Sequence, residues 1–366
     1  MPQAAQAAIL PALATPFEIK AIDLPMPVGD EVLVQVAGCG ICHTDIKVSR
    51  GYANVPVPVI LGHEGAGIVL ETGPECDTLQ PGDHVVMSFP SCGQCQQCVS
   101  HHPAYCDTGQ HLSFSCQHSG NPYKSSNGDM VYGAFFGQSS FASHALVSAR
   151  NAVKVDQDLP LELLGPLGCG FQTGAGAVLN VLQPAPGEAM VIFGAGNVGL
   201  SAVMAAVIAG LDPIITLDIH AGRLVLARQL GATHVIDLSE EKSPVDAIHR
   251  LTAGRGAQYS LDTTNQPQVV RQAFECLANR GTCIHSGGGG KDLCFPGSHL
   301  LHGRTITGVI QGDSDPQAFI PKLLDYYRAG KFPFERLLSI YPLAQINRAV
   351  EEMEAGGVIK PVLMMP

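Results

Sequence analysis

The chain has 366 residues and a formal net charge of −11, with 46% hydrophobic and 14% charged residues. This length is sufficient for two hydrophobic cores, and the composition excludes a disordered chain. The acidic charge disfavours binding to nucleic acid or to anionic membrane surfaces. A metabolic enzyme with a small-molecule substrate fits these properties better.

The N-terminal residues and the cysteines indicate the compartment. Residues 1–17 contain no cationic start followed by an apolar run and a cleavage site. Twelve cysteines in such a chain indicate metal binding or catalysis rather than disulfides, so we predict a location in the reducing cytoplasm. The uncharged run 189–211 has the length of a membrane span, but its four glycines favour a buried strand followed by a packed helix.

Short strands dominate the first half of the chain. Residues 31–36 alternate apolar and polar side chains, as a half-buried strand does. Up to about residue 170, short apolar runs are separated by Gly, Pro, Asp and Asn. This pattern predicts an antiparallel, β-rich domain with irregular loops.

Strand and helix patterns alternate from about residue 171. The predicted strands are 190–193, 214–218, 234–236, 259–262, 282–285 and 305–309, and the predicted helices are 198–209, 221–230, 245–252 and 267–278. Such alternation predicts a parallel, doubly wound sheet. About the last 50 residues have the pattern of two helices and a closing strand at 361–365.

Four clustered cysteines have the spacing C-x2-C-x2-C-x7-C, at Cys92, Cys95, Cys98 and Cys106. Four thiolates at this spacing can complete a tetrahedral shell around Zn²⁺, which leaves no open position and makes such a site structural. An iron–sulfur cluster is the alternative metal group. A zinc ribbon that binds nucleic acid is disfavoured by the acidic charge.

A second possible metal site combines Cys42, His63 and Cys169, each of which lies in a glycine-rich segment. Two Cys and one His form a three-ligand zinc site with one vacant position, the type that catalytic zinc sites have. Each of these residues alone is ambiguous, because a single buried Cys is usually part of a core.

A dinucleotide fingerprint occupies residues 194–199, Gly-Ala-Gly-Asn-Val-Gly, between a predicted strand and a predicted helix. Gly194 allows the tight turn, Gly196 lets the backbone approach a pyrophosphate, and Gly199 lets the helix pack closely on the strand. The predicted helix begins at Val198, directly after Asn197, and its N-terminus favours phosphate.

The next predicted strand ends in an acid, Asp218, which lies 19 residues after Gly199. A carboxylate there accepts hydrogen bonds from the adenosine ribose and repels a 2′-phosphate, so NAD is favoured over NADP. Arg223 leaves the choice open, because an Arg nearby can also bind a 2′-phosphate.

These motifs together resemble the zinc-containing medium-chain dehydrogenase/reductase (alcohol dehydrogenase) family. The stretch Gly62-His63-Glu64-x2-Gly67-x5-Gly73-x2-Cys76 matches the zinc signature of that family, and the four cysteines and the fingerprint follow in the family's order. The resemblance covers essentially the whole chain. Residues 172–182 and 193–206 are most similar to bacterial aryl (benzyl) alcohol dehydrogenases.

The resemblance implies an α/β protein with three parts. Residues 1–170 would form a GroES-like, β-rich catalytic domain with a structural zinc lobe at 92–106. Residues 171–310 would form an NAD-binding Rossmann domain with a doubly wound parallel sheet, and residues 311–366 would return to the catalytic domain. The family also suggests a homodimer or a homotetramer.

The resemblance also implies two zinc ions per subunit and a set of catalytic residues. Cys42, His63 and Cys169 would hold the catalytic zinc, and the four-cysteine lobe would hold the structural zinc. Asp45 would accept a hydrogen bond from the His63 imidazole. Glu64 would lie behind the metal.

By the same resemblance, five residues would contact the cofactor. His43 would face the pyrophosphate, and Thr173 and Val198 would face the nicotinamide. Lys360 would reach the cofactor phosphates, and Arg223 would flank the adenosine ribose.

The implied reaction is oxidation of an alcohol, in which zinc lowers the alcohol pKa and NAD accepts a hydride. Thr44 would pass the substrate proton outward. Many family members have a His where this chain has Lys47, so Lys47, water or direct transfer from the ribose hydroxyl to solvent remain open for the last step.

The substrate class depends on the pocket walls, which by position are Phe89, Phe135, Phe136 and Ile310. Each Phe could instead be an ordinary core residue. Aromatic walls suit primary aryl or allylic alcohols, such as benzyl, cinnamyl or terpenoid alcohols, better than ethanol. The alternatives are a zinc dehydrogenase of a polyol or of a glutathione–formaldehyde adduct, a zinc-free quinone or enoyl reductase, and a non-enzymatic zinc protein.

Overall fold

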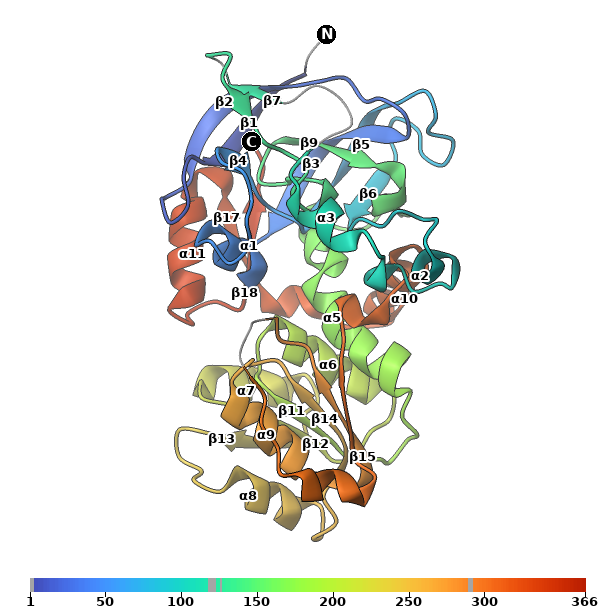
Figure 1. Ribbon diagram of the computed structural model, residues 1–366, viewed down its shortest axis with the longest axis vertical. Helices are drawn as coiled ribbons and strands as arrows, with labels where there is room; N and C mark the ends of the chain where they lie inside the picture. Colours follow the sequence, from blue (N-terminus) through green and yellow to red (C-terminus); the bar gives the residue numbers. More distant parts are fainter. Residues whose placement is uncertain (1–2, 118–122, 126, 289–291) are drawn as a thin grey trace. The chain divides into compact units, whose positions relative to one another are not determined.

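A computed structural model of the protein describes all residues except 1–2, 118–122, 126 and 289–291. The chain forms two compact units (Figure 1). Unit 1 comprises Met1–Cys169, Asp315–Lys322 and Glu335–Pro366, and unit 2 comprises Gly170–Ser314 and Leu323–Phe334. Within the described residues, no helix combines the length and the apolar character that a membrane crossing needs.

Unit 1 is built on two sheets. The first has the strand order β4-β1-β2-β7-β8, formed by Val59–Ile60, Gln3–Leu10, Glu18–Leu24, Tyr123–Ser125 and Met130–Val131. The second has the order β10-β6-β5-β3-β18-β17, with β9 also paired to β3. Its strands, in chain order from β3, are Glu31–Gly40, Gly65–Thr72, His84–Met87, His144–Ser148, Ala152–Val155, Leu338–Pro342 and Lys360–Met364.

Strand β3 is the centre of unit 1, because it pairs antiparallel with β5, β9 and β18. The predicted alternating strand 31–36 is its first part, and nearly all of β3 is buried because both faces are covered. Pairing with β18 brings residues 362–364 beside residues 38–40. The sheet therefore joins segments that lie far apart in the sequence.

Short helices connect these strands. They are α1 His43–Ser49, α2 Gln96–Val99, α3 Gly109–Phe114, α4 Leu161–Leu164 and α11 Ile346–Glu354, with α10 Pro316–Arg328 beginning in unit 1. The 3₁₀ turns η1 Pro103–Tyr105, η2 Phe135–Gly137 and η4 Gly165–Gly168 lie next to predicted site residues. Helix α11 was expected from the sequence, whereas β17 was not, because exposed residues interrupt its apolar pattern.

Unit 2 is a parallel sheet with the order β13-β12-β11-β14-β15-β16 (Figure 1). In chain order its strands β11 to β16 are Met190–Phe193, Ile214–Asp218, His234–Asp237, Ala257–Asp262, Leu277–His285 and Thr305–Gly308. Its helices α5 to α9 are Gly170–Gly176, Asn197–Ile208, Ala221–Gln229, Pro244–Leu251 and Pro267–Glu275.

Helices cover both faces of this sheet. Val191 and Phe193 of β11 share a core with residues of α8 and α9, including Ile248 and Phe274. The side chain between them, Ile192, lies against Gly199 of α6, which therefore packs on the opposite face. The sheet is doubly wound, as the alternating pattern predicted.

Several elements begin or end a few residues from the predicted positions, and β15 begins at Leu277, five residues before the predicted strand 282–285. The predicted helix 267–278 ends at Glu275, because Leu277 already pairs with Ala257 in the sheet. The segment 311–366 was expected to return as a whole to the first domain, but residues 311–314 and 323–334 belong to unit 2. There Phe334 is buried against Phe171 and Tyr327, with ring centroids 5.5 and 4.8 Å away.

Candidate functional site

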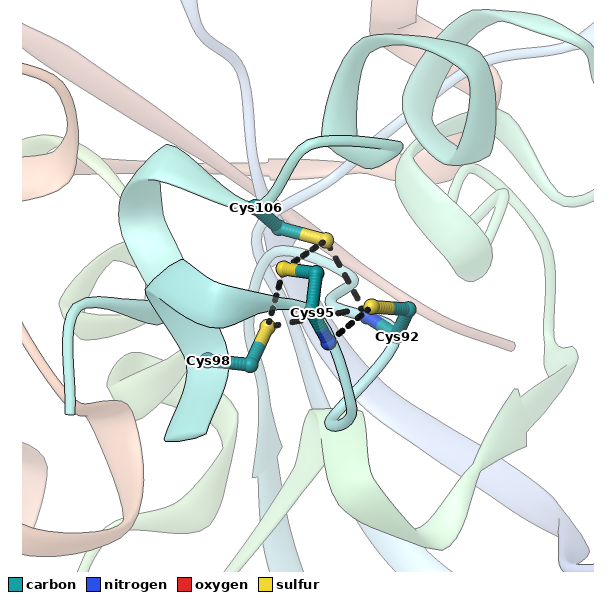
Figure 2. Close-up of side chains that lie close together, drawn as sticks. All are labelled: Cys92, Cys95, Cys98 and Cys106. Carbon is teal, nitrogen blue, oxygen red and sulfur yellow. Dashed lines mark hydrogen bonds between the residues drawn. The ribbon is translucent and has the colours of Figure 1, made fainter. Parts of the chain in front are cut away.

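The four-cysteine lobe of unit 1 brings four sulfur atoms together (Figure 2). Cys92 and Cys95 precede α2, Cys98 lies on α2, and Cys106 follows η1. Sγ–Sγ distances are 3.5 Å between Cys95 and Cys98, 3.9 Å between Cys95 and Cys106, and 4.0 Å between Cys92 and Cys98. Tetrahedral Zn–S bonds of about 2.3 Å space sulfurs about 3.8 Å apart, so this cluster fits a zinc ion.

The electrostatics of the lobe also favour a bound cation. Backbone N–H groups of Gln94 and Cys95 lower the pKa of Cys92 to about 6, whereas burial and the neighbouring Cys95 sulfur raise the pKa of Cys98 to about 12. Thiols this close cannot all ionise without a compensating positive charge. A divalent cation removes that repulsion and allows four thiolates to coexist.

The second cluster in unit 1 consists of Cys42, His63, Glu64 and Cys169. Their ligand atoms lie within 4.8 Å of one another, and all but the half-buried Cys42 are buried. Cys42 stands at the N-terminus of α1, His63 precedes β5, and Cys169 directly follows η4. The structure thus brings together the three ligands predicted from separate parts of the sequence, with Glu64 beside them.

Asp45 holds this cluster in place. Its carboxylate accepts hydrogen bonds from the backbone N–H of Cys42 at 2.9 Å and of Gly62 at 3.1 Å, and lies 2.8 Å from Nδ1 of His63. Because an ionised carboxylate only accepts, Nδ1 carries the proton. Nε2 of His63 is buried and has no hydrogen-bond partner among the described residues, as expected of a nitrogen that ligates a metal.

The side chains of this cluster shift the pKa values of one another. A hydrogen bond from the Cys169 thiol holds the pKa of Cys42 well below its usual range, and the same contact raises the pKa of Cys169. Burial lowers the pKa of His63, but the Asp45 carboxylate outweighs it and the net pKa is raised. The Cys42, His63 and Cys169 cluster therefore fits a zinc ion. Cys42 is already favoured as a thiolate, which is the form of cysteine that binds a metal.

Lys360 corrects one expectation. It was expected to reach the cofactor phosphates, but in unit 1 it is fully buried on β18. Its Nζ donates to Ile41 O at 3.0 Å and to both carboxylate oxygens of Glu64 at 2.9 and 2.8 Å. Burial raises the pKa of Glu64 to about 7, against the opposite effect of Lys360. A buried carboxylate requires such a partner, which is why the Lys side chain is held here.

The fingerprint lies at the carboxyl end of β11 in unit 2. Gly194 has φ +97°, which favours glycine, and a Cβ on Gly199 would lie 1.8 Å from Gly194 O. Gly196 precedes the first residue of α6, and a Cβ there would meet no atom within 4 Å, so space remains at the helix N-terminus. Asn197 Nδ2 is buried without a hydrogen-bond partner among the described residues. This arrangement suits a pyrophosphate.

Asp218 ends β12 and is buried next to the fingerprint. One carboxylate oxygen accepts the N–H of Ala195 at 2.6 Å and the other accepts the N–H of His220 at 2.8 Å. The acid is therefore fixed against the fingerprint turn, with further lone pairs for a ligand. Arg223 lies on α7, and its Nε is buried without a hydrogen-bond partner in the described chain.

The remaining expected residues are divided between the two units. In unit 1, His43 and Thr44 are the first residues of α1; His43 is exposed and Thr44 is half-buried. The Lys47 ammonium lies 5.8 Å from the centre of the Tyr52 ring. In unit 2, Thr173 is half-buried on α5 and Val198 is half-buried on α6.

An aromatic cluster surrounds His63 in unit 1. The Phe136 ring stacks on the imidazole, with centroids 4.5 Å apart and an interplanar angle of 27°, and the Phe135 ring meets it edge-on at 5.8 Å. Phe114 of α3 contacts both phenylalanines at 6.0 and 5.3 Å. Sequence reasoning missed Phe114, for which only the apolar spacing within α3 was a signal.

The predicted pocket walls therefore differ in their roles. Phe135 is fully buried in the core of unit 1, and Phe89 is almost fully buried. These two residues therefore pack within the protein more than they line a substrate pocket. Phe136 is half-buried, with backbone angles φ 49° and ψ 34° that bulky residues rarely adopt. Ile310 lies in unit 2 and is 55% exposed.

Comparisons with known proteins identify the family of the chain. Residues 29–157 match the family described as alcohol dehydrogenase GroES-like domain, and residues 197–326 match the family described as zinc-binding dehydrogenase. The chain is 46% identical to geraniol dehydrogenase of Castellaniella defragrans over 365 residues, covering 98% of this chain and 97% of that protein.

Two of the solved structures that cover 100% of this chain and of their own chains share at least 42% of its sequence. One is an alcohol dehydrogenase zinc-binding domain protein from Burkholderia ambifaria, with 46% identity and a TM-score of 0.97. The other is benzyl alcohol dehydrogenase from Acinetobacter calcoaceticus, with 42% identity and a TM-score of 0.95. The predicted fold class, a GroES-like domain with a Rossmann domain, is confirmed.

Proposed function

The chain belongs to the zinc-containing medium-chain alcohol dehydrogenase family, and we propose that it oxidises primary aryl or allylic alcohols, including terpenoid alcohols, to aldehydes with NAD. The observation that supports this substrate class is the half-buried Phe136 ring stacked on His63, with Phe114 and Phe135 packed against it. The relatives named for geraniol and for benzyl alcohol point to the same class of substrate.

Phe136 is the most informative member of that cluster. A left-handed backbone conformation at a bulky residue costs on the order of 1–3 kcal/mol and persists at functional sites where the surroundings impose it. Here it places one face of the ring on the imidazole of His63. A planar aromatic or allylic group near this metal ligand gains offset or edge contacts that ethanol is too small to make.

Cys42, His63 and Cys169 would hold the catalytic zinc, and the four-cysteine lobe would hold a structural zinc. The catalytic zinc supplies Lewis acidity, which makes an alcohol easier to deprotonate near neutral pH. The protein orients the ligands: Asp45 fixes the imidazole through Nδ1, and Lys360 balances the charge of Glu64. We assign to the Thr44 hydroxyl the transfer of the substrate proton toward solvent, by its position two residues after Cys42.

The fingerprint and Asp218 support NAD as the hydride acceptor. The N-terminus of α6 offers N–H groups to the pyrophosphate, and Asp218 offers an anionic acceptor to the adenosine ribose. The same carboxylate repels a 2′-phosphate, which favours NAD over NADP. The cytoplasmic location and the homodimeric or homotetrameric state stay predictions, and a mass measurement in solution would decide the latter.

Initial rates of NADH formation test the proposal. We would compare benzyl alcohol, cinnamyl alcohol, geraniol and ethanol, with NAD or NADP, and with or without a zinc chelator. We expect the aryl and allylic alcohols to lead by a wide margin in kcat/KM, NAD to exceed NADP, and chelation to abolish the rate. Faster turnover of ethanol would refute the substrate class, and equal use of both cofactors would refute the role of Asp218.

A matched variant isolates the aromatic contribution. Phe136→Leu keeps an apolar side chain of similar volume but removes the ring that stacks on His63. We expect kcat/KM for benzyl alcohol to fall about fivefold to tenfold, because aromatic pairs are worth about 0.5–1.5 kcal/mol beyond area burial. Ethanol, which lacks a ring, should change much less. An equal loss for both substrates would indicate damage to the metal site instead.

A further inference from the structure

Unit 2 contains a buried acid that the sites above do not use. Asp262 ends β14 and is fully buried. Its carboxylate accepts hydrogen bonds from the backbone N–H of Thr264 at 3.1 Å, the Thr264 hydroxyl at 2.6 Å and the backbone N–H of Asn265 at 3.2 Å. It also lies 3.0 Å from Nδ1 of His285, so this nitrogen carries a proton toward it.

The pair joins two loops at one edge of the sheet. β14 and β15 are parallel neighbours, and Asp262 and His285 are register partners at their carboxyl ends. The loop after β14 is bound to the loop after β15 a second time, because Asn265 Nδ2 donates to Gly288 O at 2.8 Å. Packing is close, since a Cβ on Gly287 would lie 2.6 Å from Asn265 Cβ and 2.9 Å from His285 Cε1.

The same loop also contacts the dinucleotide fingerprint. The Thr263 hydroxyl donates to Phe193 O at 3.0 Å and lies 3.3 Å from Gly194 O. The carboxyl ends of β11, β14 and β15 therefore form one hydrogen-bonded edge, with the fingerprint at one end and His285 at the other. His285 is not sealed in the core, since 17% of its side chain is exposed.

The strand order indicates which part of a dinucleotide meets this edge. Ligands of doubly wound sheets bind outside the carboxyl ends of the strands, where the strand order reverses. In unit 2 this point lies at β11, with β12 on one side and β14 followed by β15 on the other. A dinucleotide with its pyrophosphate at the fingerprint and its adenosine ribose at Asp218 of β12 extends its other nucleotide toward β14 and β15.

We propose that Asp262 and His285 are positioning residues for the nicotinamide half of the cofactor. This rests on the proposed use of a nicotinamide dinucleotide. The pair holds the loops 262–266 and 285–288 in one conformation, so that their backbone groups are preorganised for that nucleotide. The adenosine half does not depend on the pair, because Asp218 is fixed separately by Ala195 and His220.

Calorimetric titration of the intact protein with NADH and with ADP tests this inference. ADP contains the adenosine ribose and two phosphates but lacks the nicotinamide nucleotide. In His285→Ala we expect NADH to bind about tenfold more weakly, since a hydrogen bond to a charged group is worth about that factor. ADP affinity should stay within about twofold of wild type. His285→Gln, whose amide N–H can still donate to Asp262, should restore part of the NADH affinity.

Ser260→Ala is the matched control for mere loss of stability. Ser260 is buried in the same strand, and its hydroxyl donates to Ala273 O at 2.6 Å, away from both loops. This variant should lower the melting temperature and leave the ratio of the NADH and ADP affinities unchanged. If His285→Ala does not fold, Asp262→Asn replaces it as the variant that weakens the pair, and His285→Gln remains the conservative variant.

The outcomes separate this inference from the proposed function. Equal weakening of NADH and ADP, no weakening of either, or the same ratio change in Ser260→Ala would overturn the positioning role while leaving the cofactor assignment intact. Failure of the wild-type protein to bind NADH would overturn the cofactor assignment and the positioning role together.

Discussion

The two thiol clusters of unit 1 differ in how the chain assembles them. The lobe takes Cys92, Cys95, Cys98 and Cys106 from one short segment, and most of these residues are only half-buried. The other cluster takes Cys42, His63 and Cys169 from three distant segments and is almost entirely buried. The first is a local loop that a metal would hold together, whereas the second is formed by the surrounding fold.

This difference extends to the neighbouring groups. Sulfur atoms of the lobe receive hydrogen bonds from the lobe's own backbone, such as Cys95 N–H to Cys92 Sγ at 3.3 Å. The buried cluster instead depends on Asp45, and its neighbour Glu64 depends on Lys360. We therefore expect metal loss to cost stability in the lobe and activity in the buried cluster.

The largest effect is expected from Cys169→Ala. Loss of this ligand should remove the catalytic zinc and lower kcat/KM for benzyl alcohol on the order of 10³-fold, because Lewis-acid stabilisation is worth several kcal/mol. Zinc analysis should show one ion per chain instead of two, with an unchanged far-ultraviolet circular dichroism spectrum. Cys283→Ala, at a buried thiol outside both clusters, should retain both zinc ions. Full turnover by Cys169→Ala would refute the assignment of Cys169 as a ligand of the catalytic zinc.

Cys98→Ala should act on stability instead. A closed four-ligand site contributes its binding free energy to folding, so we expect the melting temperature to fall by roughly 5–10 °C as one zinc is lost. Molecules that remain folded should keep the catalytic zinc. The control is Cys116→Ala, a buried thiol outside both metal clusters. A large loss of activity without a change in melting temperature would contradict the division of roles.

Asp45→Asn should weaken metal binding in the buried cluster alone. The carboxylate that orients His63 is replaced by a neutral amide, and loss of such an orienting group typically costs 10–100-fold in metal affinity. Competition with a chromophoric chelator measures the affinity of each site. Equal weakening at the four-cysteine lobe would show that the substitution acts through general unfolding.

The smallest effect is expected from Arg150→Ala. The Arg150 guanidinium lies beside the cysteine loop, since a Cβ on Gly93 would be 2.3 Å from its Cζ. Its positive charge opposes the excess negative charge of four thiolates around one divalent ion. Because exposed charges contribute about 0–1 kcal/mol, zinc should leave the lobe only about twofold to fivefold faster. Lys154→Ala is the control. An unchanged rate of zinc release in Arg150→Ala would show that Arg150 does not stabilise the metal-bound lobe.

Local patterns predicted much of the fold and of the metal-binding residues. Strands 190–193 and 214–218 were predicted with the bounds that β11 and β12 have, because parallel buried strands are continuous apolar runs. The four-cysteine lobe followed from residue type and spacing. Cys42, His63 and Cys169 followed from residue type, glycine-rich segments and the family resemblance, and the structure brings each cluster together. The assignment of these residues as zinc ligands stays a prediction until metal analysis is done.

Contacts between distant segments were not predictable in the same way. The pairing of Lys360 with Glu64 depends on β18 lying beside β3, and nothing in either local sequence specifies that neighbour. The stacking of Phe136 on His63 depends on a left-handed backbone that apolar spacing does not reveal. Asp262 and His285 likewise meet only because β14 and β15 are in register.

The ion pair of Glu64 with Lys360 also bears on biosynthesis. Translation proceeds from the N-terminus, so the ribosome adds Glu64 296 residues before Lys360. Until β18 emerges and pairs with β3, Glu64 lacks the Lys360 ammonium, and a carboxylate without such a partner is costly to bury. The interior of unit 1 therefore closes only after unit 2 has been synthesised. In that interval the nascent chain exposes apolar strands, the kind of surface that makes folding intermediates prone to aggregation.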